Sequence, residues 1–189
     1  MSGRLFLPDN TVLVNFARIG RMDLLRLFAA GRSTWCYTVS QECEKSSRVS
    51  GLEQLAEAPG IFGDPLMLES RLELSDMRVF QAQLKKPGDG RAANLGEAES
   101  LSLIIHRKLD AVFITDDNGA LRFAQAHGIQ HVTTWDLFKT FVRVNRLDRD
   151  TAWSYVQVLG GDRRRYEELR SQDAFNAWLE SPESLRFVP

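Results

Sequence analysis

Acidic residues occur at four separate places in the 189-residue sequence where a strand is expected to end or a helix to begin. In chain order they are Asp9, Glu42, the pair Glu97 and Glu99, and the pair Asp116 and Asp117. In an open α/β sheet, ligands bind beyond the carboxyl ends of the strands, so these side chains are predicted to meet at one edge. Carboxylates brought together repel one another unless a cation neutralises them, and a set of oxygen ligands favours Mg²⁺ or Mn²⁺. The acids therefore indicate a divalent-metal site.

Each acidic position also has an ordinary structural explanation. Glu97 and Glu99 in a first helical turn would be stabilised by the helix dipole, and "DDNG" at 116–119 is a common turn and cap sequence. Asp9 can belong to a turn, and Glu42 can be a solvated surface residue. Independent surface acids would seldom fall at one edge of a sheet, so their predicted convergence favours the metal site.

A helical wheel separates the two glutamates of "LGEAESLSLI". At 100° per residue, Ala98, Leu101 and Ile104 form one apolar arc. Glu97 borders this arc, whereas Glu99 lies about 200° round the helix from Glu97, nearer the outer face. Glu97 is therefore predicted to be the main metal ligand of the pair, with Glu99 turned outward unless the helix start frays.

The spacing of apolar and turn-forming residues predicts the elements that position these acids. Strands are expected at 4–8, 34–39, 110–115 and 130–134, with a further partial strand at 66–74. Helices are expected between the strands, including one capped by Ser75 and one over about 96–108. Strands and helices that alternate in this way indicate an α/β fold with a largely parallel central sheet and flanking helices.

Composition limits the classes of protein to which the chain can belong. With 43% hydrophobic residues and a net charge of −1, the chain suits a compact core and lacks the strongly basic balance of a duplex-binding protein. Cys36 and Cys43 fit neither a disulfide framework nor a zinc pattern, and Cys36 is expected to be a buried structural thiol. We see neither a signal peptide nor an apolar run of the roughly 18 residues that span a bilayer, so no membrane contact and a cytoplasmic location are expected.

Four segments together resemble the PIN-domain ribonucleases. They are "LPDNTVLVNFARIGRMDLL", "TVSQECEK", "LGEAESLSLI" and "AVFITDD", in this order, and the similarity covers roughly residues 4–135. The "GEAES" form is also similar to the related flap-endonuclease family, in which two acids of such a segment approach metal. The chain departs from the usual Asp-Thr-Asn opening, because it has Asp9, Asn10 and Thr11 at this place.

The resemblance implies a PIN-like three-layer sandwich that hydrolyses RNA phosphodiester bonds with metal-activated water. It divides the chain into a nuclease domain, 1–145, and a helical C-terminal extension, 146–189. The implied catalytic residues are Asp9, Glu42, Glu97 and Asp116, and the implied ligands of Mg²⁺ or Mn²⁺ are Asp9, Glu97, Glu99, Asp116 and Asp117. Many such proteins are toxins of toxin–antitoxin pairs, so an RNA substrate, an antitoxin protein and a homodimer are the expected partners.

Other features leave alternatives open. The basic run Arg163, Arg164 and Arg165 is either a solvated helix face or a patch that contacts nucleic-acid phosphates. The aromatic residues of the tail are expected to pack helices together rather than to stack on bases, and the three histidines lack metal-ligand spacing. Two further functions compete with the ribonuclease: a degenerate PIN module that binds RNA or protein, and a phosphohydrolase of small esters. The second of these lacks the expected Asp-x-Asp after the first strand.

Overall fold

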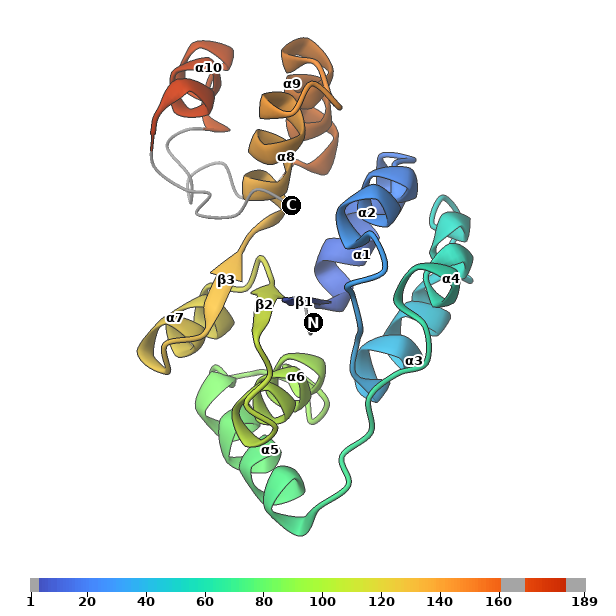
Figure 1. The fold of residues 1–189 in the computed structure, drawn as a ribbon, viewed down its shortest axis with the longest axis vertical. Coiled ribbons are helices and arrows are strands. Elements are labelled where there is room, and N and C mark those ends of the chain that lie inside the picture. The colour runs from blue at the N-terminus through green and yellow to red at the C-terminus, as the bar shows by residue number, and fades with distance from the viewer. Residues whose placement is uncertain (1–3, 161–168, 183–189) are drawn as a thin grey trace. The chain divides into compact units, whose positions relative to one another are not determined.

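A computed structural model describes residues 4–160 and 169–182 of the chain (Figure 1). The chain divides into two compact units between Thr133 and Thr134. This division falls earlier than the boundary after residue 145 that the family resemblance implies. None of the helices in the described residues is both long and apolar enough to cross a lipid bilayer.

The first unit contains a small parallel sheet and most of the helices. Its elements are β1 (Leu5–Pro8), α1 (Asn10–Arg18), α2 (Met22–Ala29), α3 (Tyr37–Ser46), the 3₁₀ helix η1 (Glu53–Glu57), α4 (Pro59–Phe62), α5 (Arg71–Leu84), α6 (Leu95–His106), β2 (Ala111–Ile114), α7 (Asn118–Ala126) and β3 (Gln130–Val132). The second unit contains α8 (Thr134–Arg143), α9 (Arg149–Leu159) and α10 (Gln172–Glu180). The prediction of an α/β fold with a parallel sheet is confirmed.

The three strands of the described residues end in register. The sheet has the order β1-β2-β3, both pairs are parallel, and Pro8, Ile114 and Val132 lie side by side at the carboxyl end. The backbone N–H of Asp9 then donates to the carbonyl of Ile114 at 2.9 Å, and that of Thr115 donates to Val132 at 3.1 Å. The residues that follow β1 and β2 are consequently held next to each other.

Side chains alternate between the two faces of the sheet, as the period of a strand requires. Leu7 of β1 and Phe113 of β2 belong to a buried cluster with residues of α5, α6 and α7. Phe6, which directly precedes Leu7 in β1, instead packs on Phe28 of α2, with ring centroids 4.3 Å apart. Figure 1 shows α5, α6 and α7 on one side of the strands and α1 to α4 on the other. Helices therefore cover both faces of the sheet.

The expected strand at 34–39 is wrong. Cys36 forms a single bridge with Leu66, and α3 begins immediately afterwards at Tyr37. The apolar character of this segment reflects burial of a connecting loop, because Trp35 is 2% exposed and its indole N–H donates to a loop carbonyl at 2.8 Å. Burial of Cys36 as a free thiol agrees with the prediction.

The expected partial strand at 66–74 is also wrong. Ser70 and Glu73 form a reciprocal capping box, which starts α5 at Arg71, earlier than the predicted cap at Ser75. Two of the leucines that suggested a strand, Leu72 and Leu74, lie on this helix, where Leu72 is 68% exposed. A capping box satisfies two backbone N–H donors at once and so stabilises the start of the helix. The spacing of apolar residues does not reveal this local stabilisation.

Aromatic side chains hold the helices of the second unit together. The ring of Phe175 in α10 lies 5.6 Å from that of Trp153 in α9 and 5.7 Å from that of Trp178. The ring centroids of Phe138 in α8 and Tyr155 in α9 are 6.0 Å apart. The prediction that the tail aromatics pack helices is confirmed for these rings.

Candidate acidic site

Asp9 lies at the centre of the carboxyl edge of the sheet. It follows β1 directly and is the N-cap of α1, where its Oδ1 accepts a hydrogen bond from the Val12 N–H at 2.8 Å. Its Oδ2 accepts a short hydrogen bond from the hydroxyl of Thr115, the residue that follows β2. Asp9 is 2% exposed, so this carboxylate is buried and tied across two neighbouring strands.

The two aspartates after β2 have different partners. Asp116 accepts a hydrogen bond from the side-chain amide of Asn15 in α1 at 2.8 Å, which holds it on the side of Asp9. Asp117 is the N-cap of α7 and accepts from the backbone N–H groups of Gly119 and Ala120 at 2.7 and 2.9 Å. Asp116 is therefore the better candidate for a ligand, and Asp117 has a structural role as a cap.

The outward position predicted for Glu99 is wrong. Glu99 is 4% exposed and accepts a hydrogen bond from the backbone N–H of Thr38, in the first turn of α3, at 2.9 Å. Glu97 is only partly buried. A helical wheel separates inward from outward residues only where one face is covered, whereas α6 packs against α3, α5, α7 and β2 and is buried around most of its circumference.

Glu42 reaches the site from the middle of α3, not from its first turn as expected. A close approach of α3 to the start of α6 brings it there. A Cβ atom built on Gly96 would lie 3.2 Å from Glu42 Oε2 and 2.9 Å from a methyl group of Val39. The absence of a side chain at Gly96 thus lets the Glu42 carboxylate approach the end of α6 that carries Glu97.

Burial and mutual repulsion raise the pKa values of three of these acids. Burial raises the pKa of Asp9 well above its ordinary value; the Thr115 hydrogen bond lowers it, and the charges of Asp116 and Glu97 raise it further. Burial likewise raises the pKa of Glu97. The pKa of Glu42 rises to about 7 through burial and the charge of Glu97, with partial compensation by Lys45.

Asp117 shows the opposite behaviour. Burial would raise its pKa, but the hydrogen bonds from Ala120 and Gly119 and the charge of Lys86 outweigh this effect and lower it. The Nζ of Lys86 lies 3.4 Å from Asp117 Oδ2. Asp117 is consequently a charged carboxylate that Lys86 and the backbone N–H groups stabilise. The negative charges of Asp9, Glu42 and Glu97 beside it are balanced less completely.

The donor set suits a hard divalent cation in chemistry and in charge. Its atoms are carboxylate oxygens, and the charges of Asp116 and Glu97 both act unfavourably on the anionic form of Asp9. In the described part of the chain, however, no three Asp, Glu, His or Cys side chains lie close enough together to hold one metal ion. The acids therefore share one region of the edge without forming a three-carboxylate cluster.

Arg163, Arg164 and Arg165 lie outside the described residues. Two polar residues that the sequence argument missed, Thr115 and Asn15, orient Asp9 and Asp116. Thr115 had a detectable signal, because it is the first polar residue after an apolar strand and directly precedes the two aspartates.

No protein-family model matches the chain, and neither the curated proteins nor the solved structures include a significant match to it. The chemistry of the acidic edge must therefore be argued from the chain's own residues.

Proposed function

We propose that the protein is a divalent-metal-dependent ribonuclease of the PIN type, with its active site at the acidic edge. One observation carries the proposal: a buried aspartate, Asp9, is tied across the carboxyl ends of two parallel strands beside two further acids, Asp116 and Glu97. Buried acids that raise one another's pKa values are costly for stability and cluster at functional sites. A PIN-like sandwich is compatible with the small parallel sheet and the helices on both its faces.

Each acid has a distinct role in this proposal. Asp9, with Asp116 or Glu97, would supply one or two carboxylates to Mg²⁺ or Mn²⁺, which keeps several of its waters in such sites, and Glu42 would accept a proton from the attacking water. When bound, the ion supplies an activated water and neutralises charge on the phosphate. A base is most effective when its pKa lies near the working pH, and the pKa of Glu42, about 7, satisfies this condition. Glu99 is held by Thr38 and would act by positioning α3 against α6.

A second function, an RNA- or protein-binding module that does not cleave, is favoured by a different observation. The described residues contain no cluster of three possible metal ligands, which is the arrangement that a degenerate site would show. An antitoxin partner and a homodimer rest on the sequence resemblance alone and stay predictions.

Cleavage of labelled RNA by the full chain distinguishes the two functions. The ribonuclease should cut in Mg²⁺ or Mn²⁺ and stop in excess EDTA, and Asp9→Asn should lower the rate by about a hundredfold or more, since it removes a central charge. Glu69→Gln is the matched control, because Glu69 is an exposed acid away from the edge. A wild type that binds RNA but never cuts it in either ion would establish the binding module. An Asp9→Asn variant as active as wild type would exclude Asp9 from the chemistry.

A further inference from the structure

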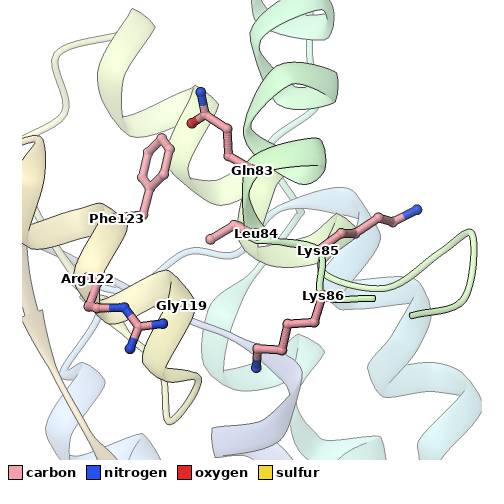
Figure 2. A pocket seen from close by; sticks show the side chains of 7 residues that line it. All are labelled: Gln83, Leu84, Lys85, Lys86, Gly119, Arg122 and Phe123. Carbon is pink, nitrogen blue, oxygen red and sulfur yellow. The ribbon is translucent and has the colours of Figure 1, made fainter. Parts of the chain in front are cut away.

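A pocket lined by three cationic side chains opens beside the acidic edge (Figure 2). It has a volume of about 410 Å³ and lies between the end of α5, the loop that follows it, and α7. Its lining consists of Gln83, Leu84, Lys85, Lys86, Gly119, Arg122 and Phe123. The pocket therefore combines an apolar floor, formed by one leucine and one phenylalanine, with positive charge at its margin.

Two of the three cations face the pocket. Figure 2 shows the side chains of Lys86 and Arg122 reaching from different elements toward the same part of it, whereas Lys85 extends away from them. The Nζ of Lys85 donates to the carbonyl of Arg91 at 2.8 Å, so this lysine fixes the loop. Within the described residues, the Arg122 side chain takes part in no hydrogen bond or ion pair. Its five N–H donors are thus available to a ligand.

Lys86 connects the pocket to the acidic edge. Its ion pair with Asp117, at 3.4 Å, places its positive charge at the boundary between the two. The start of α7 does not itself supply the binding groups, because the N–H groups of Gly119 and Ala120 already donate to Asp117. The side chains of Lys86 and Arg122 are therefore the groups that can attract an anion.

We propose that Lys86 and Arg122 bind a phosphate of the RNA strand next to the cleavage site, an inference that rests on the proposed ribonuclease function. An acidic edge on a chain of net charge −1 repels RNA, so a local pair of cations is needed to hold the flanking strand. The guanidinium of Arg122 matches the geometry of a phosphate, and Lys86 adds a point charge. The Leu84 and Phe123 floor offers an apolar surface to the sugar or base of the same nucleotide.

The test is the binding of a fluorescent single-stranded RNA to the full chain in excess EDTA, where cleavage and metal binding do not contribute. Arg122→Gln and Lys86→Gln should each weaken binding about fivefold to tenfold, since each loses a charged phosphate contact. Each should also flatten the slope of log K against log salt by about 0.7, the contribution of one phosphate contact in a single strand. Arg78→Gln removes the same charge from the exposed side of α5, away from the pocket, and should leave both values unchanged.

Cleavage assays then separate this inference from the proposed function. In Mn²⁺, the two pocket variants should raise KM with little change in kcat. If they bind and cleave RNA as Arg78→Gln does, the phosphate site is wrong even though the ribonuclease stands. If wild type binds RNA through the pocket but does not cut it, the ribonuclease is wrong and the phosphate site stands. A wild type that binds no RNA in EDTA overturns the phosphate site whatever the cleavage result.

Discussion

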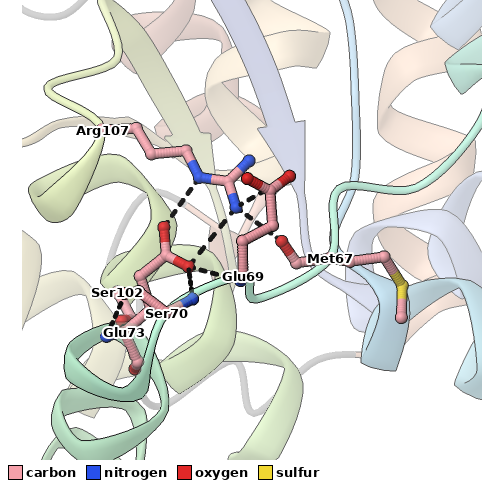
Figure 3. Close-up of polar contacts among 6 residues, drawn as sticks. All are labelled: Met67, Glu69, Ser70, Glu73, Ser102 and Arg107. Atoms are coloured by element: carbon pink, nitrogen blue, oxygen red, sulfur yellow. Dashed lines mark hydrogen bonds and ion pairs between the residues drawn. The ribbon is translucent and has the colours of Figure 1, made fainter.

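Acidic side chains are buried in two regions of the first unit, and the charges around them differ. Glu73 of α5 is 5% exposed and is paired with Arg107, whose Nε lies 2.8 Å from Glu73 Oε1 (Figure 3). Arg107 also donates to the carbonyl of Met67 at 2.6 Å, and the backbone N–H groups of Glu69 and Ser70 donate to Glu73. The hydrogen bond from Arg107 lowers the pKa of Glu73 to about 2, so the carboxylate is charged and compensated.

At the acidic edge, the charged groups that act on the buried Asp9 are other acids. Burial raises the pKa of Asp9, and two adjacent carboxylates raise it further, with hydrogen bonds from Thr115 and Val12 as the opposing effects. Lys45 compensates Glu42 only in part. The comparison separates two uses of a buried carboxylate. An acid paired with arginine joins α5, its preceding loop and the end of α6, whereas grouped buried acids cost stability, an arrangement that is typical of functional sites.

The largest effect is expected from breaking the Glu73–Arg107 pair. Arg107→Ala leaves a buried carboxylate without its cation and should lower the free energy of unfolding by about 3 kcal/mol. Urea denaturation measures this loss. Arg78→Ala is the control, because Arg78 is an exposed arginine in α5. A loss no larger than that of the control would mean that the pair contributes nothing beyond a surface ion pair.

Metal binding should affect only the acidic edge. At a free-ion concentration of about 100 times Kd, Mn²⁺ or Mg²⁺ should stabilise the wild type by about 2.7 kcal/mol, because the ion binds the native state. Asp9→Asn should abolish most of this shift. Glu69→Gln, which changes an acid beside Arg107, should retain it. A melting temperature that both ions leave unchanged at millimolar concentration would exclude the shared metal site.

The paired glutamates of α6 sharpen the comparison within one helix. Glu97→Gln should lower metal-dependent RNA cleavage at least about tenfold, the effect of losing roughly 1.4 kcal/mol of transition-state stabilisation, with little change in stability. Glu99→Gln should instead cost about 1–2 kcal/mol of stability, since it weakens the charged hydrogen bond to Thr38. Cleavage rates and urea unfolding of both variants provide the measurement. Equal losses of cleavage would mean that both carboxylates act on the metal.

The contrast between these two glutamates also shows what the sequence could predict. The runs of apolar residues and the turn-forming residues that bound them identified α6 and β2 to within a few residues. The strand predicted at 34–39 is absent, since this buried loop has the apolar composition of a strand. The position of Asp9 at the sheet edge followed from the parallel order of the strands, which local sequence does indicate.

Side-chain surroundings could not be predicted in the same way. Glu99 accepts a hydrogen bond from Thr38 of α3, which lies 61 positions earlier in the chain. The pairing of Glu73 with Arg107 joins residues 34 positions apart and is invisible to any periodicity. The cationic pocket similarly requires Lys86 and Arg122 to approach from two elements. Local pattern therefore located the acids, and only tertiary packing distinguished the compensated acids from the others.

The smallest expected effect is a difference in the pH dependence of stability between the two regions. The folded-state pKa of Glu42, about 7, exceeds its ordinary value of 4.5, so the native state binds more protons than the unfolded state between these values. Stability contributed by Glu42 should therefore fall as the pH rises from about 4.5 to 7. Glu73 behaves oppositely, because its pKa is lowered to about 2: its contribution is complete above 4.5 and is lost as the pH falls toward 2.

Urea unfolding of wild type and Glu42→Gln between pH 4.5 and 7.5 isolates the contribution of Glu42 to the pH dependence of stability. The variant cannot titrate at this position, so its stability should decline less with pH than that of the wild type. Mn²⁺ added at pH 7.5 should bring the decline in stability of the wild type closer to that of Glu42→Gln. The ion binds deprotonated carboxylates and replaces the proton as the compensating charge. Glu44→Gln, at an exposed position of the same helix, should follow the wild type at every pH. If the free energy of unfolding changes with pH in the same way for wild type and Glu42→Gln, Glu42 titrates as a solvated surface acid. Glu42 would then not be the proton acceptor of the acidic edge.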